Sequence, residues 1–256
     1  MRRAALLSLI VIIVMPARAF AVPPGPEPSL VALGGLQEAR AYARGRAGTV
    51  GFAVVEPGGK LRGLNVNRWF YSASVVKAML ALEVVREAQH RSLTATERAL
   101  LHPMITVSDN GAASAVYRRL GGAGLYRVAR AAHMTHFADV GNWADAHITP
   151  ADQARLFLRI DKLAPRRHRH YLRGLLASIV PSQRWGIAPV AAARDFHIMF
   201  KGGWRTNISH QVALLERDGQ RVALAVLTSG AADGYGRLIE TGVAERILAS
   251  RPPRPQ

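Results

Sequence analysis

The chain has 256 residues, and none of them is cysteine. This absence excludes a disulfide framework and an anchor attached through a lipid-modified cysteine. Packing alone must therefore stabilise the fold. The length is sufficient for one large α/β unit, or for two closely packed sub-domains with a sizeable core.

Lysine is scarce in a chain that is otherwise rich in basic residues. There are 30 arginines but only four lysines, namely Lys60, Lys77, Lys162 and Lys201. A guanidinium group stays protonated, whereas an amine can lose its proton in a suitable environment. A lysine in this background therefore indicates a position where an amine must titrate, and two of the four lie in the motifs described below.

The apolar run near the N-terminus is too short to span a bilayer comfortably. Ala4–Met15 follows Arg2-Arg3 and is itself followed by small residues at the spacing of a cleavage site. This three-part layout predicts a secretory signal peptide over residues 1–21, and hence a secreted or cell-envelope protein. The arginine pair is compatible with both the general and the twin-arginine export routes.

Acidic residues are too few to balance the charge. The formal net charge is +17, and it would still be +14 after removal of the three arginines in residues 1–21. Export and the scattered distribution of the arginines argue against a nucleic-acid partner. We expect the basic surface to meet anionic cell-wall polymers or lipid head groups. Solubility combined with arginine-rich codon usage explains the charge equally well.

Hydrophobic periodicity and turn residues divide the chain into a linker at 22–29, a tail at 251–256 and a series of elements between them. The predicted elements are a helix over 30–46, a strand over 49–56 with its partner at 61–66, mainly helices over 72–180, strands over 210–216 and 220–228, and a helix over 235–249. Asp218-Gly219 between the last two strands is a strong hairpin signal.

This order predicts an α+β fold. Residues 30–66 and 186–250 would form an antiparallel sheet from both chain ends, flanked by helices. Residues 67–185 would form an inserted all-helical sub-domain. No internal repeat interrupts this arrangement.

The first motif with chemical content is Ser74-Val75-Val76-Lys77. Side chains at positions i and i+3 share one face of a helix. If Ser74 opens a helix, its hydroxyl lies at the positive end of the helix dipole, where an oxyanion is stabilised. Burial would lower the pKa of Lys77 and let it accept the serine proton. Alone, Ser-x-x-Lys is close to a chance match, and it favours an N-capping serine with a surface lysine over a catalytic pair.

Two further motifs follow in the chain. Ser108-Asp109-Asn110 precedes a helical run, where it is also good N-cap chemistry. Lys201-Gly202-Gly203 ends the apolar run 196–200, where the simple alternative is a turn that terminates a strand. Each motif is weak alone, and their joint order carries the argument.

Together the three motifs resemble the S-x-x-K, S-D-N and K-T-G set of class A β-lactamases and penicillin-binding enzymes. Gly121-Gly122 and the segment 182–187 extend the likeness, which covers roughly residues 30–249. The resemblance implies a β-lactamase/transpeptidase-like fold and a serine hydrolase that forms an acyl-enzyme.

The resemblance also implies roles for individual residues. Ser74 would be the nucleophile, Lys77 its base, Ser108 the proton donor to the leaving nitrogen, and Lys201 the electrostatic partner of a substrate carboxylate. The backbone N–H groups of Ser74 and Trp204 would form the oxyanion hole. Residues Asn110, Gly203, Trp204 and His210 would bind the substrate.

Three departures from the family pattern concern substrate binding and turnover. Gly202 replaces a threonine or serine, and His210 falls where many class A enzymes have an arginine. The family's Ω-loop carries a glutamate that activates the deacylating water, but here Ala144 takes that place in a shortened loop and no glutamate occurs between Glu97 and Glu216. Asp145 is the candidate substitute.

We therefore expect an exported serine hydrolase that acts on β-lactam or cell-wall-peptide-like amides, in the manner of a β-lactamase or a D-Ala-D-Ala peptidase. Deacylation should be poor, so efficient β-lactamase activity is doubtful. The alternative is a pseudoenzyme that serves as a cell-wall binding module. The sequence predicts no cofactor and no metal site, and it does not determine the oligomeric state.

Overall fold

The computed structural model describes residues 29–250. The predicted signal peptide over residues 1–21, most of the linker and the C-terminal tail lie outside the described residues. Within the described part, no helix is both long and apolar enough to cross a membrane.

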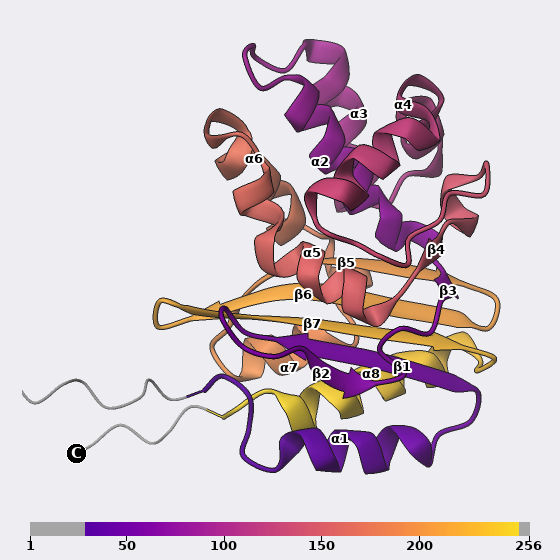
Figure 1. Cartoon of the computed structure of the whole chain (residues 1–256), viewed down its shortest axis with the longest axis vertical. Coiled ribbons are helices and arrows are strands. Elements are labelled where there is room, and N and C mark those ends of the chain that lie inside the picture. Colours follow the sequence, from indigo (N-terminus) through magenta and orange to yellow (C-terminus); the bar gives the residue numbers. More distant parts are fainter. Residues whose placement is uncertain (1–28, 251–256) are drawn as a thin grey trace, which may run out of the picture.

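A five-stranded antiparallel sheet forms the centre of the molecule (Figure 1). Its strand order is β2-β1-β7-β6-β5, so β1 from the N-terminal part pairs with the last strand, β7, and β2 pairs with β1 at the edge. The strands are β1 Thr49–Val55, β2 Arg62–Leu64, β5 His197–Arg205, β6 Ile208–Arg217 and β7 Gln220–Ser229. This topology confirms the predicted sheet built from both chain ends.

Both faces of the sheet are covered by helices (Figure 1). Helices α1 Gly35–Arg44, α7 Ile187–Ala193 and α8 Asp233–Ile247 lie on one face. The other face carries α5 Pro150–Leu163, and beyond it lie α2 Lys77–Glu87, α3 Ala95–Thr106, α4 Asn110–Ala131 and α6 Arg166–Ala177. The α+β class with a helical layer is therefore as predicted, although α5, within the range 67–185, packs directly on the sheet.

Turn chemistry explains why the final hairpin forms where the sequence predicts it. Asp218 and Gly219 have φ angles of 51° and 78°, the left-handed values that a two-residue hairpin turn requires. The strands on either side are almost completely buried, because helices cover both faces of the sheet. The hairpin therefore fixes the register of the strand β6, which in turn pairs with the motif-bearing strand β5.

A short two-stranded sheet connects the helical layer to the candidate site. Its strands are β3 Phe70–Tyr71 and β4 His147–Ile148. It brings the segment before Ser74 next to the end of the shortened loop, and Ser72 N–H donates to the carbonyl of Ala146 at 2.8 Å. Three single-turn 3₁₀ helices complete the fold: η1 Ala73–Val76, η2 Trp143–Asp145 and η3 Pro181–Gln183.

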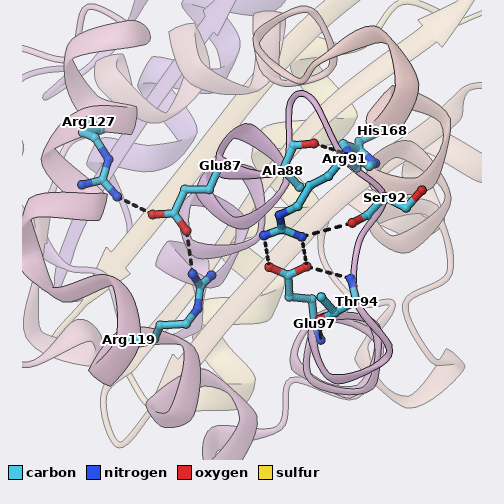
Figure 2. Close-up of polar contacts among 9 residues, drawn as sticks. All are labelled: Glu87, Ala88, Arg91, Ser92, Thr94, Glu97, Arg119, Arg127 and His168. Carbon is cyan, nitrogen blue, oxygen red and sulfur yellow. Dashed lines mark hydrogen bonds and ion pairs between the residues drawn. The ribbon is translucent and has the colours of Figure 1, made fainter.

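His168 lies on the buried face of helix α6, although it stands in the strongly basic segment 166–170. Its side chain is buried, and Nε2 lies 3.0 Å from the carbonyl oxygens of both Ala88 and Arg91 (Figure 2). The reason is helical periodicity, because His168 shares the inner face of α6 with Leu172 and Leu175. The ring therefore ties α6 to the end of α2.

Candidate active site

Ser74 lies in a 3₁₀ turn rather than at the start of an α-helix. The turn η1 spans residues 73–76, and Lys77 is the first residue of α2. This corrects the expected helix start, but residues i and i+3 eclipse one another in a 3₁₀ turn, so Ser74 and Lys77 still share a face. Ala73, just before the serine, has a left-handed φ of 42°. For a residue with a Cβ this is a strained conformation of the kind found at functional sites.

The amine of Lys77 is fully buried and makes three short polar contacts. Nζ donates to the carbonyl of Ser108 at 2.6 Å and to Asn110 Oδ1 at 2.7 Å, and it lies 3.2 Å from Ser108 Oγ. Burial lowers its pKa to about 8, with the charge of Asp109 opposing the change. Among residues 29–250, no carboxylate forms an ion pair with Lys77.

Lys201 approaches Ser108 from the sheet. It lies on β5 and is fully buried, with Nζ 3.1 Å from Ser108 Oγ and 2.9 Å from the carbonyl of Gly202. Burial holds the pKa of Lys201 well below its ordinary value, and the neighbouring charge of Lys77 lowers it further. The two motif lysines therefore meet at the Ser108 hydroxyl.

The Ser108-Asp109-Asn110 segment acts both as a helix N-cap and as part of the candidate site, and different residues perform the two roles. Asp109 is the N-cap of α4, because its Oδ1 accepts the N–H of Ala112 at 2.6 Å. Ser108 has a left-handed φ of 60°, and its oxygens, together with Oδ1 of Asn110, contact the lysines. The capping aspartate thus holds the polar residues on either side of it in position.

Gly203 and Gly202 stand in very different surroundings. A Cβ on Gly203 would lie 2.9 Å from the backbone nitrogens of Ser74 and Val75, closer than real Cβ contacts come. Gly203 therefore lies directly against the backbone of Ser74, one of the two expected oxyanion-hole donors, and the peptide that follows Gly203 carries the other, the N–H of Trp204. A Cβ on Gly202 would meet only the Trp185 ring at 3.6 Å, an ordinary contact.

The shortened loop places an aromatic ring beside Lys77. Lys77 Nζ lies 4.8 Å from the ring centroid of Trp143, the residue before Ala144. The carboxylate of Asp145 is engaged elsewhere: Oδ1 pairs with Arg205 at 2.6 Å, and Oδ2 accepts from Asn142 at 2.8 Å. Asp145 therefore has its recorded partners outside the lysine–serine cluster.

The family model of the β-lactamase enzyme family matches residues 92–248, which is more than half of the chain. The protein belongs to the β-lactamase enzyme family. The matched segment contains Ser108 and Lys201 but begins after Ser74 and Lys77, so the assignment of nucleophile and base depends on the motif and the geometry described above.

Solved structures of the family share the fold at low sequence identity. A β-lactamase from Sphaerobacter thermophilus aligns with a TM-score of 0.73 at 20% identity, over 83% of this chain and 95% of that one. A β-lactamase from Xanthomonas campestris gives 0.68 at 21%, over 82% and 94%. The structure of PBP-A gives 0.68 at 18%, over 82% and 94%. The search of curated proteins found no match.

His210 occupies a buried structural position in this β-lactamase fold. Its ring is fully buried, with Nε2 2.9 Å from the carbonyl of Tyr71 and Nδ1 accepting the N–H of Thr228 at 3.1 Å. Burial lowers its pKa to about 4. As placed, both ring nitrogens contact the backbone and neither is left for the substrate carboxylate that the sequence prediction assigned to His210.

The contacts of Trp143 are the part of the site that sequence reasoning missed. The motif spacing locates Ser74, Lys77, Ser108 and Lys201. The structure joins Lys77, Ser108 and Lys201 through hydrogen bonds, with Asn110 bound to Lys77 and the Trp204 ring near Lys201, and it places the backbone of Ser74 against Gly203. An aromatic residue in a loop otherwise made of small and polar residues was the only available signal. Within the described part of the chain, no group of three or more metal-ligating side chains gathers at one place.

Proposed function

We propose that the protein is an exported serine hydrolase that forms an acyl-enzyme on Ser74, with Lys77 as the base. Its substrates would be β-lactams or cell-wall-peptide-like amides, such as those ending in D-Ala-D-Ala. The observation that carries the proposal is the buried amine of Lys77, one 3₁₀ turn from Ser74, whose pKa is lowered to about 8 without a carboxylate partner. An appreciable fraction of this amine is neutral near physiological pH and is able to accept a proton.

In the first step, Ser74 Oγ attacks the amide carbonyl carbon and its proton passes to Lys77 Nζ. The developing oxyanion accepts hydrogen bonds from the N–H groups of Ser74 and Trp204. When the tetrahedral intermediate collapses, the C–N bond breaks and Ser108 Oγ donates its proton to the leaving nitrogen. Lys77, 3.2 Å from that hydroxyl, returns the proton to Ser108. The products of this step are a Ser74 ester and a free amine.

Hydrolysis of the ester requires a base for the attacking water. No glutamate occurs between Glu97 and Glu216, and Asp145 is in an ion pair with Arg205. Lys77 lies one 3₁₀ turn from the nucleophile, but its amine donates to the carbonyl of Ser108 and to Asn110 Oδ1, and it forms no ion pair with a carboxylate among residues 29–250. We therefore propose slow deacylation and an acyl-enzyme that accumulates.

Substrate affinity should be modest. Position 202 offers no hydroxyl to a substrate carboxylate, and His210 is committed to backbone contacts. The partly exposed guanidinium of Arg205, at the end of β5, attracts an anionic substrate, although its ion pair with Asp145 reduces this effect. The strongly basic composition supports retention on anionic cell-wall polymers after export.

The test is covalent labelling with a fluorescent penicillin. We expect labelling of the wild type, none of Ser74→Ala, and faster labelling of Gly202→Thr, because the added hydroxyl reaches the substrate carboxylate. The absence of any adduct with penicillin or with activated esters, together with salt-sensitive wall binding, would contradict the hydrolase proposal and support the pseudoenzyme module.

A further inference from the structure

Trp143 is fixed at both ends. Its indole Nε1 donates to Ser114 Oγ on α4 at 3.2 Å, and its backbone carbonyl accepts from Ser72 Oγ at 2.9 Å. The short helix that carries it packs against η1. The ring is half-buried, so the two hydrogen bonds hold it in place against the neighbouring amine of Lys77.

The Trp143 ring differs in its electrostatic effect from the other groups around the Lys77 amine. Neutral oxygens of Ser108 and Asn110 accept from the amine. The charged groups that act on it are Lys201 from β5, which shares the Ser108 hydroxyl, and Asp109 before α4. No ion pair to Lys77 occurs within residues 29–250. The face of an aromatic ring carries partial negative charge, so the Trp143 ring favours the protonated amine.

We propose that Trp143 is a positioning residue for Lys77. The face of the Trp143 ring stabilises the ammonium form of Lys77 and holds its amine beside Ser74. The contact between the Trp143 ring and Lys77 is seen in the structure, whereas its effect on catalysis rests on the proposed role of Lys77 as base. Trp143 touches neither substrate nor reacting atoms in this role. It acts through Lys77, in place of the carboxylate that a buried lysine ordinarily needs.

The consequence is a compensation between two effects on one amine. Burial favours the neutral form of Lys77, and the Trp143 ring opposes it by favouring the charged form. The ring thereby keeps Lys77 able to return a proton to Ser108 after accepting one from Ser74. An aliphatic side chain at position 143 would fill space without this electrostatic contribution.

The scarcity of lysine makes a direct measurement feasible. With four lysines in the chain, an NMR titration of protein carrying ¹³C at lysine Cε gives few signals, and the signal lost in Lys77→Arg assigns the residue. We expect the pKa of Lys77 to fall by roughly 0.5 to 1.5 in Trp143→Leu and by less in Trp143→Phe, which keeps an aromatic face but loses the indole N–H. Ser114→Ala, which releases the indole N–H, should shift it in the same direction by less.

The matched control is Trp69→Leu. Trp69 is exposed and stacks on His147 at 4.2 Å between ring centroids, so its removal should leave the Lys77 signal unchanged. An unchanged or raised pKa in Trp143→Leu would overturn the inference. Should that variant not fold, Trp143→Met and Ser114→Ala provide the same comparison, with the same direction required.

Acylation by penicillin, followed over pH in the same variants, separates this inference from the proposed function. A wild type that never acylates, combined with a lowered Lys77 pKa in Trp143→Leu, would defeat the hydrolase and leave the role of Trp143 standing. A wild type that acylates, combined with identical pH profiles for tryptophan, phenylalanine and leucine at position 143, would defeat the inference alone.

Discussion

The side-chain amines of Lys77 and Lys201 converge on one hydroxyl: Ser108 Oγ lies 3.2 Å from the first Nζ and 3.1 Å from the second. Two buried amines at such a short separation do not both carry a full charge easily, because each cation disfavours the other. The charge of Lys77 accordingly lowers the pKa of Lys201. We therefore expect the two amines to titrate as a coupled pair.

Lys77→Met should raise the pKa of Lys201, because the substitution removes the neighbouring charge at similar volume. The lysine Cε titration described above measures this. Lys162→Met, at an exposed position on α5, serves as the control and should leave Lys201 unchanged. A Lys201 signal that titrates identically in Lys77→Met and in the wild type would show that the two amines are not coupled.

The rate of acylation should rise with pH up to about 8. Lys77 accepts a proton only as the neutral amine, and burial places its pKa at about 8. Below that value the rate should fall about tenfold for each pH unit, since the neutral fraction falls in that proportion. Stopped-flow measurement with a chromogenic β-lactam gives the profile. A rate that is flat from pH 6 to 9 would exclude Lys77 as the base.

Gly203→Ala should reduce the acylation rate by about a hundredfold or more, because the added Cβ forces the strand away from the Ser74 N–H and separates the oxyanion-hole donors. Gly202→Ala is the matched control, since its Cβ makes only an ordinary contact at 3.6 Å with Trp185. Equal acylation rates in the two alanine variants would contradict the placement of the oxyanion hole between Gly203 and Ser74.

His210 should make the fold sensitive to mild acid. Its pKa is about 4 in the folded protein, below the ordinary 6.5, so the unfolded chain binds the extra proton between these values. Stability from this residue is present near pH 7 and is lost as the pH falls below 6.5, by about 2 kcal/mol at pH 5. Chemical denaturation of the wild type, His210→Gln and the exposed His90→Gln at both pH values tests this. An equal loss of unfolding free energy between pH 7 and pH 5 in all three proteins would show that groups other than His210 cause the acid sensitivity.

Local signals in the sequence account for the parts of the structure that were predicted correctly. Asp218-Gly219 determines a hairpin through its backbone preferences, and the spacing of Ser74 and Lys77 places them on one face in either type of helix. The burial of His168 could also have been predicted, because its spacing from Leu172 follows helical periodicity.

The parts that were missed depend on contacts between distant segments. The Trp143 ring meets Lys77 because Ser72, just before η1, and Ser114, on α4, bind the loop at two points distant in the sequence. Nothing local to residues 141–150 distinguishes this arrangement from one in which position 144 faces the lysine. Similarly, Arg205 engages Asp145 across the gap between β5 and the loop, a pairing that no sequence spacing indicates.

Intact mass spectrometry over time, with excess penicillin, tests the central claim most directly. The wild type should gain the mass of one penicillin and retain it over hours, while Ser74→Ala gains nothing, because we propose that Ser74 is the nucleophile and because Asp145, the candidate water-activating carboxylate, is paired with Arg205. An adduct that forms and decays within minutes would contradict slow deacylation and return Asp145 to consideration. An adduct on Ser74→Ala, or none on the wild type, would contradict the assignment of Ser74 as the nucleophile.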